Sequence, residues 1–197
     1  MSKREDAQKD AQDKDKAALR RRLLQLRRAT PAATRLAWDQ QIAAQLLDWC
    51  RRHQPRSMGV YWPIQAEPDL QALYPILSGA GIQLALPVVH TRHAPLTFVQ
   101  WTPGDMMEKD AHGIPVPAFR ETAIWPEVLV IPCVGFNRDK FRLGYGGGYY
   151  DRTLAAAPAI RPLVAIGVAY QCGLADFNSE PHDAALNVLI TEQACLA

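Results

Sequence analysis

The feature of the sequence that most constrains the fold is a continuous apolar run at residues 128–134, VLVIPCV. A strand with one face in water alternates apolar and polar residues, whereas this run stays apolar throughout. Strands of that kind are buried on both faces, as in parallel sheets that helices cover on both sides. A glycine-rich segment at 144–148 and an expected helix at about 148–157 follow the run. The run therefore predicts the centre of an α/β fold.

The rest of the chain alternates between patterns typical of strands and of helices. Residues 102–126 contain four prolines and are expected to form an irregular loop. A short helix is expected at 70–77, and further strands are expected at 58–62, 82–89, 96–101, 163–168 and 187–191. Strands that alternate with helices imply a doubly wound α/β fold with a largely parallel sheet.

The N-terminal part of the chain is expected to be an arm followed by a helix. Residues 1–15 are polar and nearly devoid of large apolar side chains, so they are predicted to form a disordered or frayed arm. A single domain is expected at 16–197. The first helix is expected to begin near Asp15, and its predicted buried stripe consists of Leu19, Leu23 and Leu26.

A second helix is expected before the first strand. Thr30 is predicted to be its N-cap and Pro31 its first helical residue, and the helix is expected to end near Arg52. The residues predicted to be buried are Leu36, Ile42, Leu46 and Trp49 or Cys50.

The composition excludes several classes of protein. Apolar residues make up 48% of the chain and charged residues 21%, as in globular proteins rather than disordered ones. No apolar run approaches the ~20 residues that span a bilayer, and the N-terminus lacks the apolar stretch of a secretory signal. The four cysteines are widely spaced and form no CxxC pair, which fits a reducing compartment rather than a disulfide framework or a zinc ribbon. A cytoplasmic location without membrane contact is therefore expected.

The charge of the chain is unevenly distributed. Residues 1–28 hold ten Lys or Arg and five Asp or Glu, although the whole chain carries only +2. A basic surface over the whole protein, the footprint of nucleic-acid binding, is therefore not indicated. RNA binding by the arginine-rich segment 20–28 stays open as an alternative, but leucines within that helix are expected to bury one of its faces.

The densest functional signal is the glycine-rich turn after the apolar run. Glycine occupies four of the five positions from 144 to 148. Glycines allow close approach of the backbone, so successive N–H groups can converge on phosphate oxygens, and the next helix presents its N-terminus to the same anion. The spacing matches neither a Walker A motif nor a GxGxxG in a Rossmann setting. A tight turn without a ligand is the alternative, and the flanking Arg142 and Asp151 argue against it.

Residues 142–152, RLGYGGGYYDR, resemble the RLGxGxGYYDR motif of the 5-formyltetrahydrofolate cyclo-ligase family. The resemblance covers essentially everything after residue 15. It continues in family order at 16–27 (KAALRRRLLQLR), 59–70 (GVYWPIQAEPDL), 96–101, 112–117 (HGIPVP) and 171–183. It implies a three-layer α/β/α fold with helices on both faces of a largely parallel sheet. One departure is clear, because many members carry lysine where this chain has Gly147.

The resemblance also implies an enzyme and its reaction. ATP would phosphorylate the formyl oxygen of 5-formyltetrahydrofolate, N10 would attack the activated carbon, and loss of phosphate would close the ring to 5,10-methenyltetrahydrofolate. The implied partners are 5-formyltetrahydrofolate, ATP as co-substrate and Mg²⁺, and the chain is expected to be a monomer. A folate- or nucleotide-binding protein without turnover is the second hypothesis, but a pure binder would not need Arg142, Asp151 and Asp183.

The resemblance assigns roles to individual residues. The implied ATP-binding residues are Lys16, Arg20, Arg142, Leu143, Gly144, Tyr145, Gly146, Gly147, Gly148, Tyr149 and Tyr150. The implied folate-binding residues are Trp62, Glu67, Trp101 and Tyr150. Arg142 and Tyr150 would be catalytic, and Asp151 and Asp183 would hold Mg²⁺. Tyr145 is expected to be an exposed lid over the nucleotide.

Each of these roles has a structural alternative. The cations could lie on a solvated helix face or form surface salt bridges, and the acids could cap a helix or occupy ordinary loops. Trp101 and Tyr149 could equally belong to the core. Trp62 and Tyr150 are therefore the better candidates for stacking on the flat pterin ring.

Overall fold

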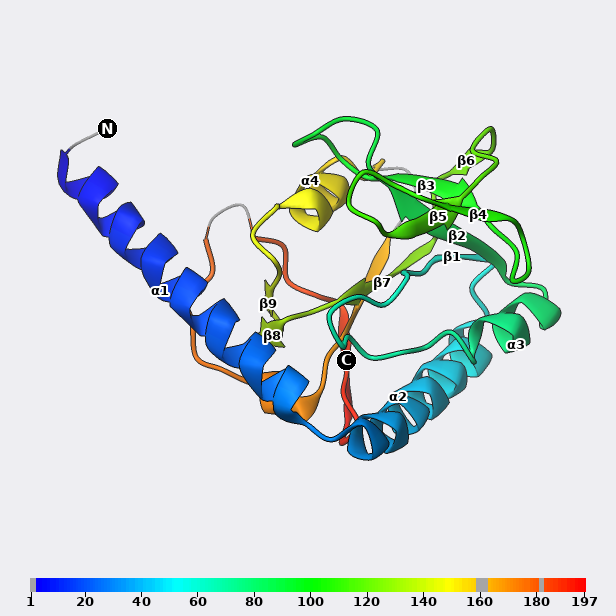
Figure 1. The fold of residues 1–197 in the computed structure, drawn as a ribbon, viewed down its shortest axis with the longest axis horizontal. Coiled ribbons are helices and arrows are strands. Elements are labelled where there is room, and N and C mark those ends of the chain that lie inside the picture. Colours follow the sequence, from blue (N-terminus) through cyan, green and yellow to red (C-terminus); the bar gives the residue numbers. More distant parts are fainter. Residues whose placement is uncertain (1–2, 159–162, 181–182) are drawn as a thin grey trace.

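The computed structural model describes residues 3–158, 163–180 and 183–197 (Figure 1). Its helices are α1 (Lys3–Ala29), α2 (Ala32–His53), α3 (Tyr74–Gly79) and α4 (Tyr149–Ala155), with a 3-10 helix η1 (Gln171–Gly173). Its strands are β1 (Ser57–Gly59), β2 (Gln83–Val88), β3 (Thr97–Gln100), β4 (Met107–Lys109), β5 (Pro115–Pro117), β6 (Ala123–Ile124), β7 (Val128–Pro132), β8 (Gly135–Phe136), β9 (Arg142–Leu143), β10 (Val164–Val168), β11 (Val188–Ile190) and β12 (Cys195–Leu196).

The centre of the fold is an eight-stranded sheet with the order β12-β11-β10-β7-β1-β2-β3-β6. The five strands from β11 to β2 are parallel to their neighbours, whereas β12, β3 and β6 join the two edges in antiparallel pairs. The largely parallel sheet expected from the sequence is confirmed. Two small two-stranded sheets, β4–β5 and β8–β9, lie outside the main sheet.

Alternate side chains of β7 point to opposite faces of the sheet, and both faces are buried. Val128 and Val130 pack in a cluster with residues of α2 and α3, while Leu129 and Ile131 pack in a second cluster that α4 covers. Figure 1 shows α2 and α4 on opposite sides of β7. The burial of β7 on both faces, which the continuous apolar run predicts, is confirmed. The three-layer arrangement is confirmed as well.

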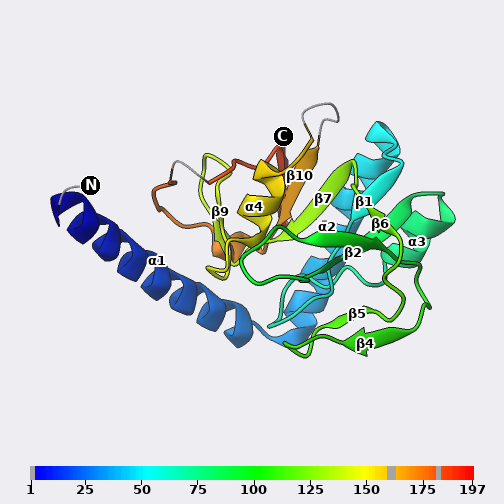
Figure 2. The same cartoon turned by 90° about the horizontal axis from the view of Figure 1, so that it is seen from above.

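The helix α1 extends away from the rest of the molecule at its N-terminal end (Figure 2). It begins at Lys3, so the predicted start near Asp15 is wrong. The division into an arm at 1–15 and a domain at 16–197 stays a prediction.

The buried stripe of α1 differs from the one expected. It consists of Lys16, Leu23 and Arg27, each at most 6% exposed, with Arg20 half-buried between them. Spacings of four, three and four residues return to the same face of a helix, so these four side chains are aligned. Leu26 lies to one side of that face and is 48% exposed, which contradicts its predicted burial. Two cations, rather than a third leucine, are therefore buried against the domain.

The start of α2 also differs in detail. Pro31 is the N-cap, with no side-chain cap, and the hydroxyl of Thr30 donates to the carbonyl of Leu26 at the end of α1. Leu36 is exposed, against expectation, because it lies near the start of α2, away from the cluster that covers the sheet. The remaining residues predicted to be buried in α2 are confirmed, namely Ile42, Leu46, Trp49 and Cys50.

The proline-rich residues 102–126 are more regular than expected, since they contain β4, β5 and β6. Pro115 and Pro117 stand in β5, which pairs only with β4, and proline is tolerated in a strand that pairs on a single side. All four cysteines are free thiols. Within the described residues, no helix is long and apolar enough to cross a membrane.

Candidate functional site

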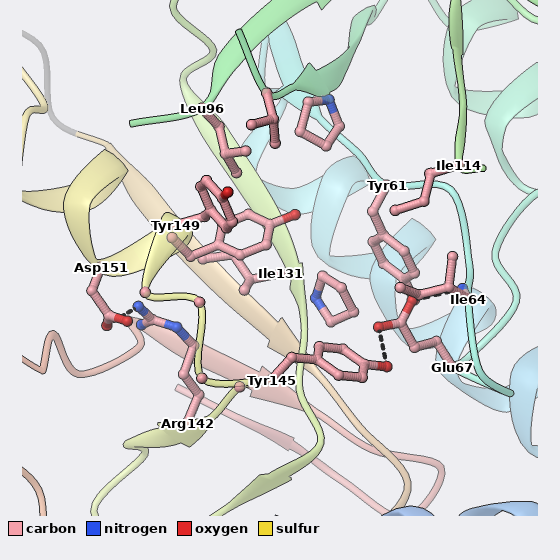
Figure 3. Close-up of a pocket in the computed structure, with 18 of the residues that line it drawn as sticks. Tyr61, Ile64, Glu67, Leu96, Ile114, Ile131, Arg142, Tyr145, Tyr149 and Asp151 are labelled. Carbon is pink, nitrogen blue, oxygen red and sulfur yellow. Dashed lines mark hydrogen bonds and ion pairs between the residues drawn. The ribbon is translucent and has the colours of Figure 1, made fainter. Parts of the chain in front are cut away.

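A cavity of about 540 Å³ opens at the carboxyl ends of β1, β2 and β7 (Figure 3). β2 contributes Leu86 and Pro87 to its wall, and β7 contributes Ile131 and Pro132. Other parts of the wall come from α1, the glycine-rich segment, the first turn of α4, the turn between β4 and β5, and the loops after β1 and before β11. Ligands of open α/β sheets bind at this edge, and the volume is in the range of small-molecule sites.

The glycine-rich segment 144–148 leads from β9 into α4. Gly146 and Gly148 have φ angles of 93° and 63°, which residues with side chains rarely adopt. Gly147 has no such angle, and a Cβ atom placed there would lie 3.0 Å from Cδ2 of Tyr149. The backbone therefore requires glycine at two positions of the turn, and Gly147 is not one of them.

Two arginines hold the glycine-rich segment through its carbonyl groups. Arg20 Nε of α1 donates to the carbonyl of Gly144 at 2.9 Å. Arg152 Nη2 of α4 donates to the carbonyl of Gly147 at 2.5 Å, and its guanidinium lies 5.3 Å from the ring centre of Tyr149. The carbonyls of Gly144 and Gly147 are thus hydrogen-bonded, which stabilises the backbone conformation of the segment.

The buried cation Lys16 forms ion pairs with two carboxylates at the cavity wall. Its Nζ lies 2.6 Å from Oε1 of Glu180 and 3.3 Å from Oδ2 of Asp183. The backbone N–H of Glu180 also donates to Oδ2 of Asp183 at 2.8 Å. All three residues line the cavity, so α1 is tied to the loop before β11 at the site itself.

Arg142 forms the other ion pair of the site. Its guanidinium pairs with Asp151 in the first turn of α4 (Figure 3). It also donates to the carbonyl of Ala184 at 2.9 Å. The side chain of Arg142 is 4% exposed, whereas that of Asp151 is 26% exposed. The carboxylate therefore holds a buried cation at the base of the glycine-rich segment.

Glu67 lies on the opposite side of the cavity and is only 4% exposed. The hydroxyl of Tyr145 donates to its Oε1 and the backbone N–H of Ile64 donates to its Oε2, both at 2.8 Å (Figure 3). Tyr145 is partly exposed, as expected, but its hydroxyl is directed to Glu67 rather than to solvent. Burial raises the pKa of Glu67, while these two hydrogen bonds and the charge of Arg27 act to lower it.

The aromatic residues of the site divide between wall and core. Trp62, Tyr149 and Tyr150 line the cavity, and burial raises the pKa of the Tyr150 hydroxyl, which is therefore protonated at neutral pH. Trp101 does not line it. Trp101 packs in the core, 6% exposed, with its ring 6.4 Å from that of Trp62 and edge-on to it.

The cavity brings together every site residue expected from the sequence except Trp101. Two acidic residues that line the cavity were missed. Glu180 is one, three residues before Asp183 in the same loop, and it lines the cavity. Asp110 is the other, and it lies in the turn between β4 and β5. Arg27 shares the helix stripe of Lys16 and Arg20 but was given no role, and it contacts the cavity wall without lining the cavity. Among the described residues, no group of three or more His, Cys, Asp or Glu is placed to hold a metal ion.

The sequence profile of the 5-formyltetrahydrofolate cyclo-ligase family matches residues 12–192. The chain belongs to this family.

Individual relatives agree with this assignment. The 5-formyltetrahydrofolate cyclo-ligase of Mycolicibacterium smegmatis is 32% identical over 188 residues, which cover 90% of this chain and 94% of the relative. That of Escherichia coli strain K12 is 29% identical, covering 77% of this chain and 86% of the relative.

Two solved structures share the fold. A 5,10-methenyltetrahydrofolate synthetase from Mycoplasma pneumoniae matches with a TM-score of 0.75 and 27% identity, covering 90% of this chain and 99% of the other. The synthetase from Aquifex aeolicus matches with a TM-score of 0.78 and 26% identity, covering 91% of each chain.

Proposed function

We propose that this chain converts 5-formyltetrahydrofolate to 5,10-methenyltetrahydrofolate with ATP and Mg²⁺. Its family consists of enzymes of folate one-carbon metabolism, and the relatives above carry the name of this activity or of its product. The observation that carries the proposal is one cavity that has both a wall of cations and backbone N–H groups, suited to phosphates, and a wall of aromatic side chains. A reaction between a nucleotide and a flat heterocycle requires both walls in one site.

The nucleotide would bind on the side of the glycine-rich segment. Lys16, Arg20 and Arg142 supply positive charge there, and the N–H groups of 144–148 supply donors. Lys16 is held by two carboxylates, so its ammonium is positioned at the cavity wall. We propose that Arg142 acts on the transferring phosphoryl group, because its planar guanidinium can contact two oxygens at once.

The residues around the nucleotide wall fit a magnesium ion that is bound partly by ATP. Asp151 and Asp183 both line the cavity, and Mg²⁺ is commonly held by one or two carboxylates together with substrate phosphates and waters. Mg²⁺ would neutralise phosphate charge as it builds up during transfer.

The pterin would bind between Glu67 and the aromatic wall. The carboxylate of Glu67 could accept hydrogen bonds from the amino and ring N–H groups of the pterin, while Trp62 and Tyr150 offer ring faces. Trp101 is not part of this proposal, because it lies behind Trp62 in the core.

The proposed chemistry needs the two substrates side by side. The formyl oxygen takes the γ-phosphoryl group of ATP and ADP leaves. N10 then attacks the formyl carbon, phosphate leaves with the former formyl oxygen, and N10 loses its proton as the methenyl bridge forms. Tyr150 lines the cavity next to the glycine-rich segment, and its protonated hydroxyl could donate to the departing phosphate oxygen, which is its proposed catalytic role.

The purified protein is expected to form 5,10-methenyltetrahydrofolate only when ATP and a divalent metal ion are both present. The absorbance of the methenyl product measures this directly, with ATP or Mg²⁺ omitted in turn. Equal product without ATP would reject the proposal, and so would a lack of product at high enzyme concentration. Binding of both substrates without product would favour the hypothesis of a binding protein without turnover.

RNA binding through segment 20–28 is not favoured by the structure. Arg27 is 3% exposed, and Arg20 donates to the glycine-rich segment, so two of the arginines are committed to the site. RNA binding would require Arg20 and Arg27 to be exposed and to contact RNA phosphates instead.

A lysine at position 147 is expected to tighten ATP binding modestly. Gly147→Lys places a charge beside the phosphates at a position whose backbone angle accepts a side chain, after a small shift of the Tyr149 ring. One partly exposed charge contributes about 0.2–1 kcal/mol, so the Kd for ATP should fall by up to about fivefold.

Gly148→Lys is the matched control for this prediction. It carries the same charge, but at a φ of 63° and with its Cβ 2.8 Å from Nη1 of Arg152, so it should weaken binding. Calorimetric titration with ATP compares the three proteins. Weaker binding by a folded Gly147→Lys variant would show that the turn needs glycine there for other reasons.

A further inference from the structure

Arg27 is a buried cation that no assigned role explains. It lies near the C-terminal end of α1, is 3% exposed, and contacts three separate segments of the cavity wall. Nε donates to the carbonyl of Gln65 at 3.2 Å, Nη1 to the carbonyl of Cys133 at 3.3 Å, and Nη2 to the hydroxyl of Tyr145 at 2.6 Å. One side chain thus joins the loop after β1, the end of β7 and the glycine-rich segment.

The contact with Tyr145 fixes the direction of a hydrogen-bond chain. A guanidinium group can only donate, so the Tyr145 oxygen accepts from Arg27 and its proton is free to point elsewhere. That proton is donated to Oε1 of Glu67 at 2.8 Å. The chain Arg27–Tyr145–Glu67 therefore presents a donor to the carboxylate, which favours the charged form of Glu67.

The contact with Gln65 acts on the backbone that positions Glu67. Gln65 and Ala66 have φ angles of 48° and 60°, in the left-handed region that residues with side chains rarely adopt. Such conformations persist only where surrounding contacts enforce them. The carbonyl of Gln65 is held by Arg27, and Glu67 closes the turn through its backbone N–H to Ile64 at 2.9 Å. Arg27 therefore stabilises the strained turn that delivers the carboxylate into the cavity.

The surroundings of Glu67 leave Arg27 as the cation that acts on it. The titratable groups that interact with its carboxylate are Arg27 of α1, Tyr61 after β1, Tyr74 of α3, Cys133 after β7, Tyr145 of the glycine-rich segment and Tyr150 of α4. Within this described set, the others are neutral groups whose own ionisation Glu67 disfavours. Without Arg27, only hydrogen bonds would oppose the rise in the pKa of Glu67 that burial causes.

We infer that Arg27 is a positioning residue for the folate substrate, which holds Glu67 in place and in its charged form through Gln65 and Tyr145. The inference rests on the proposed function, in which Glu67 binds the pterin. Arg27 itself does not line the cavity, so it acts through these two residues.

The test compares steady-state kinetics of Arg27→Met, Arg27→Lys and Tyr145→Phe with the parent enzyme. Losing a buried hydrogen bond to a charged group should raise the KM for 5-formyltetrahydrofolate about 10- to 100-fold in Arg27→Met. The KM for ATP should change by less than about threefold. Tyr145→Phe, which removes only the hydroxyl, should also raise the folate KM. Arg27→Lys should raise it less than Arg27→Met does.

Arg28→Met is the matched control. Arg28 is the next residue of the helix and bonds only the exposed side-chain oxygen of Gln65, so the folate KM should remain at the parent value. The double variant of Arg27→Met and Tyr145→Phe should raise the folate KM by less than the product of the two single increases, because both substitutions act through Glu67.

The pH dependence separates positioning from a general loss of structure. Burial already raises the pKa of Glu67 and Arg27 opposes this, so Arg27→Met should raise it further. The carboxylate then becomes protonated at a higher pH, and the acid limb of kcat/KM for folate should move to higher pH. The limb should stay in place in Arg28→Met.

Two results would overturn the inference. One is a folate KM and an acid limb that are unchanged in a folded Arg27→Met variant of an active parent. If that variant does not fold, an unchanged folate KM in Tyr145→Phe overturns it equally. A parent enzyme that makes no product is a different result, because it refutes the proposed function instead.

Discussion

Arg142→Met is expected to lower kcat by about 10²- to 10³-fold, the loss typical of removing one donor to a developing charge. Arg142 is almost fully buried, lines the cavity beside the glycine-rich segment, and is held by Asp151 and the carbonyl of Ala184. The KM for folate should change little, because Glu67 lies on the opposite wall. Methionine keeps most of the apolar contact of the side chain and removes the charge.

Two further variants define the cause of the Arg142→Met effect. Arg142→Lys keeps the charge but cannot contact Asp151, Ala184 and a phosphate oxygen together, so its kcat should be intermediate. Lys140→Met removes a nearby cation that donates to the carbonyl of Asn187 outside the cavity, and it should be neutral. Rapid-quench measurement of ADP formation isolates the phosphoryl step. A folded Arg142→Met enzyme with kcat within about threefold of the parent would exclude the proposed role.

The architecture of this protein could be predicted from local patterns. The apolar run of β7 identified the centre of a sheet buried on both faces, and the order of strands and helices identified the parallel arrangement. The strands β4, β5 and β6 were missed because they are short and proline-rich, and their pairing depends on long-range contacts rather than on composition.

The buried face of α1 shows where pattern reasoning fails. Leucine spacing predicted that Leu26 is buried, but the helix turns Lys16 and Arg27 inward instead. A cation is normally found in water, and it can be buried here only because carbonyl and carboxylate oxygens of distant segments surround it. Those oxygens belong to residues up to 167 positions away from Lys16, which no periodicity within the helix can reveal.

The glycine-rich segment could be predicted in more detail, since glycine content is a local signal. The structure adds that the four glycines are not equivalent, because Gly146 and Gly148 alone among them have positive φ angles. The aromatic residues were the harder case. Trp62 and Trp101 look alike in sequence, and only the packing of Trp101 against Tyr74, with ring centres 5.9 Å apart, assigns it to the core.

Asp183→Asn and Asp151→Asn are each expected to cut turnover at limiting Mg²⁺ by at least about 10- to 100-fold, if both carboxylates hold the metal ion. Asparagine preserves the volume and removes the charge, so the fold should survive. Titration of activity with Mg²⁺ at saturating ATP measures the effect. Asp176→Asn, an exposed acid in the segment before Glu180, is the matched control and should behave like the parent.

The ion pairs of the site make a second explanation testable in the same titration. Asp151 holds Arg142 and Asp183 holds Lys16, so either substitution could act by releasing a cation rather than by removing a metal ligand. A lost ligand raises the Mg²⁺ concentration needed for half-maximal activity, and excess Mg²⁺ restores part of the rate. A released cation lowers the rate equally at all Mg²⁺ concentrations. A variant whose Mg²⁺ dependence matches that of the parent would therefore remove that aspartate from the proposed metal site and leave it as the anchor of its cation.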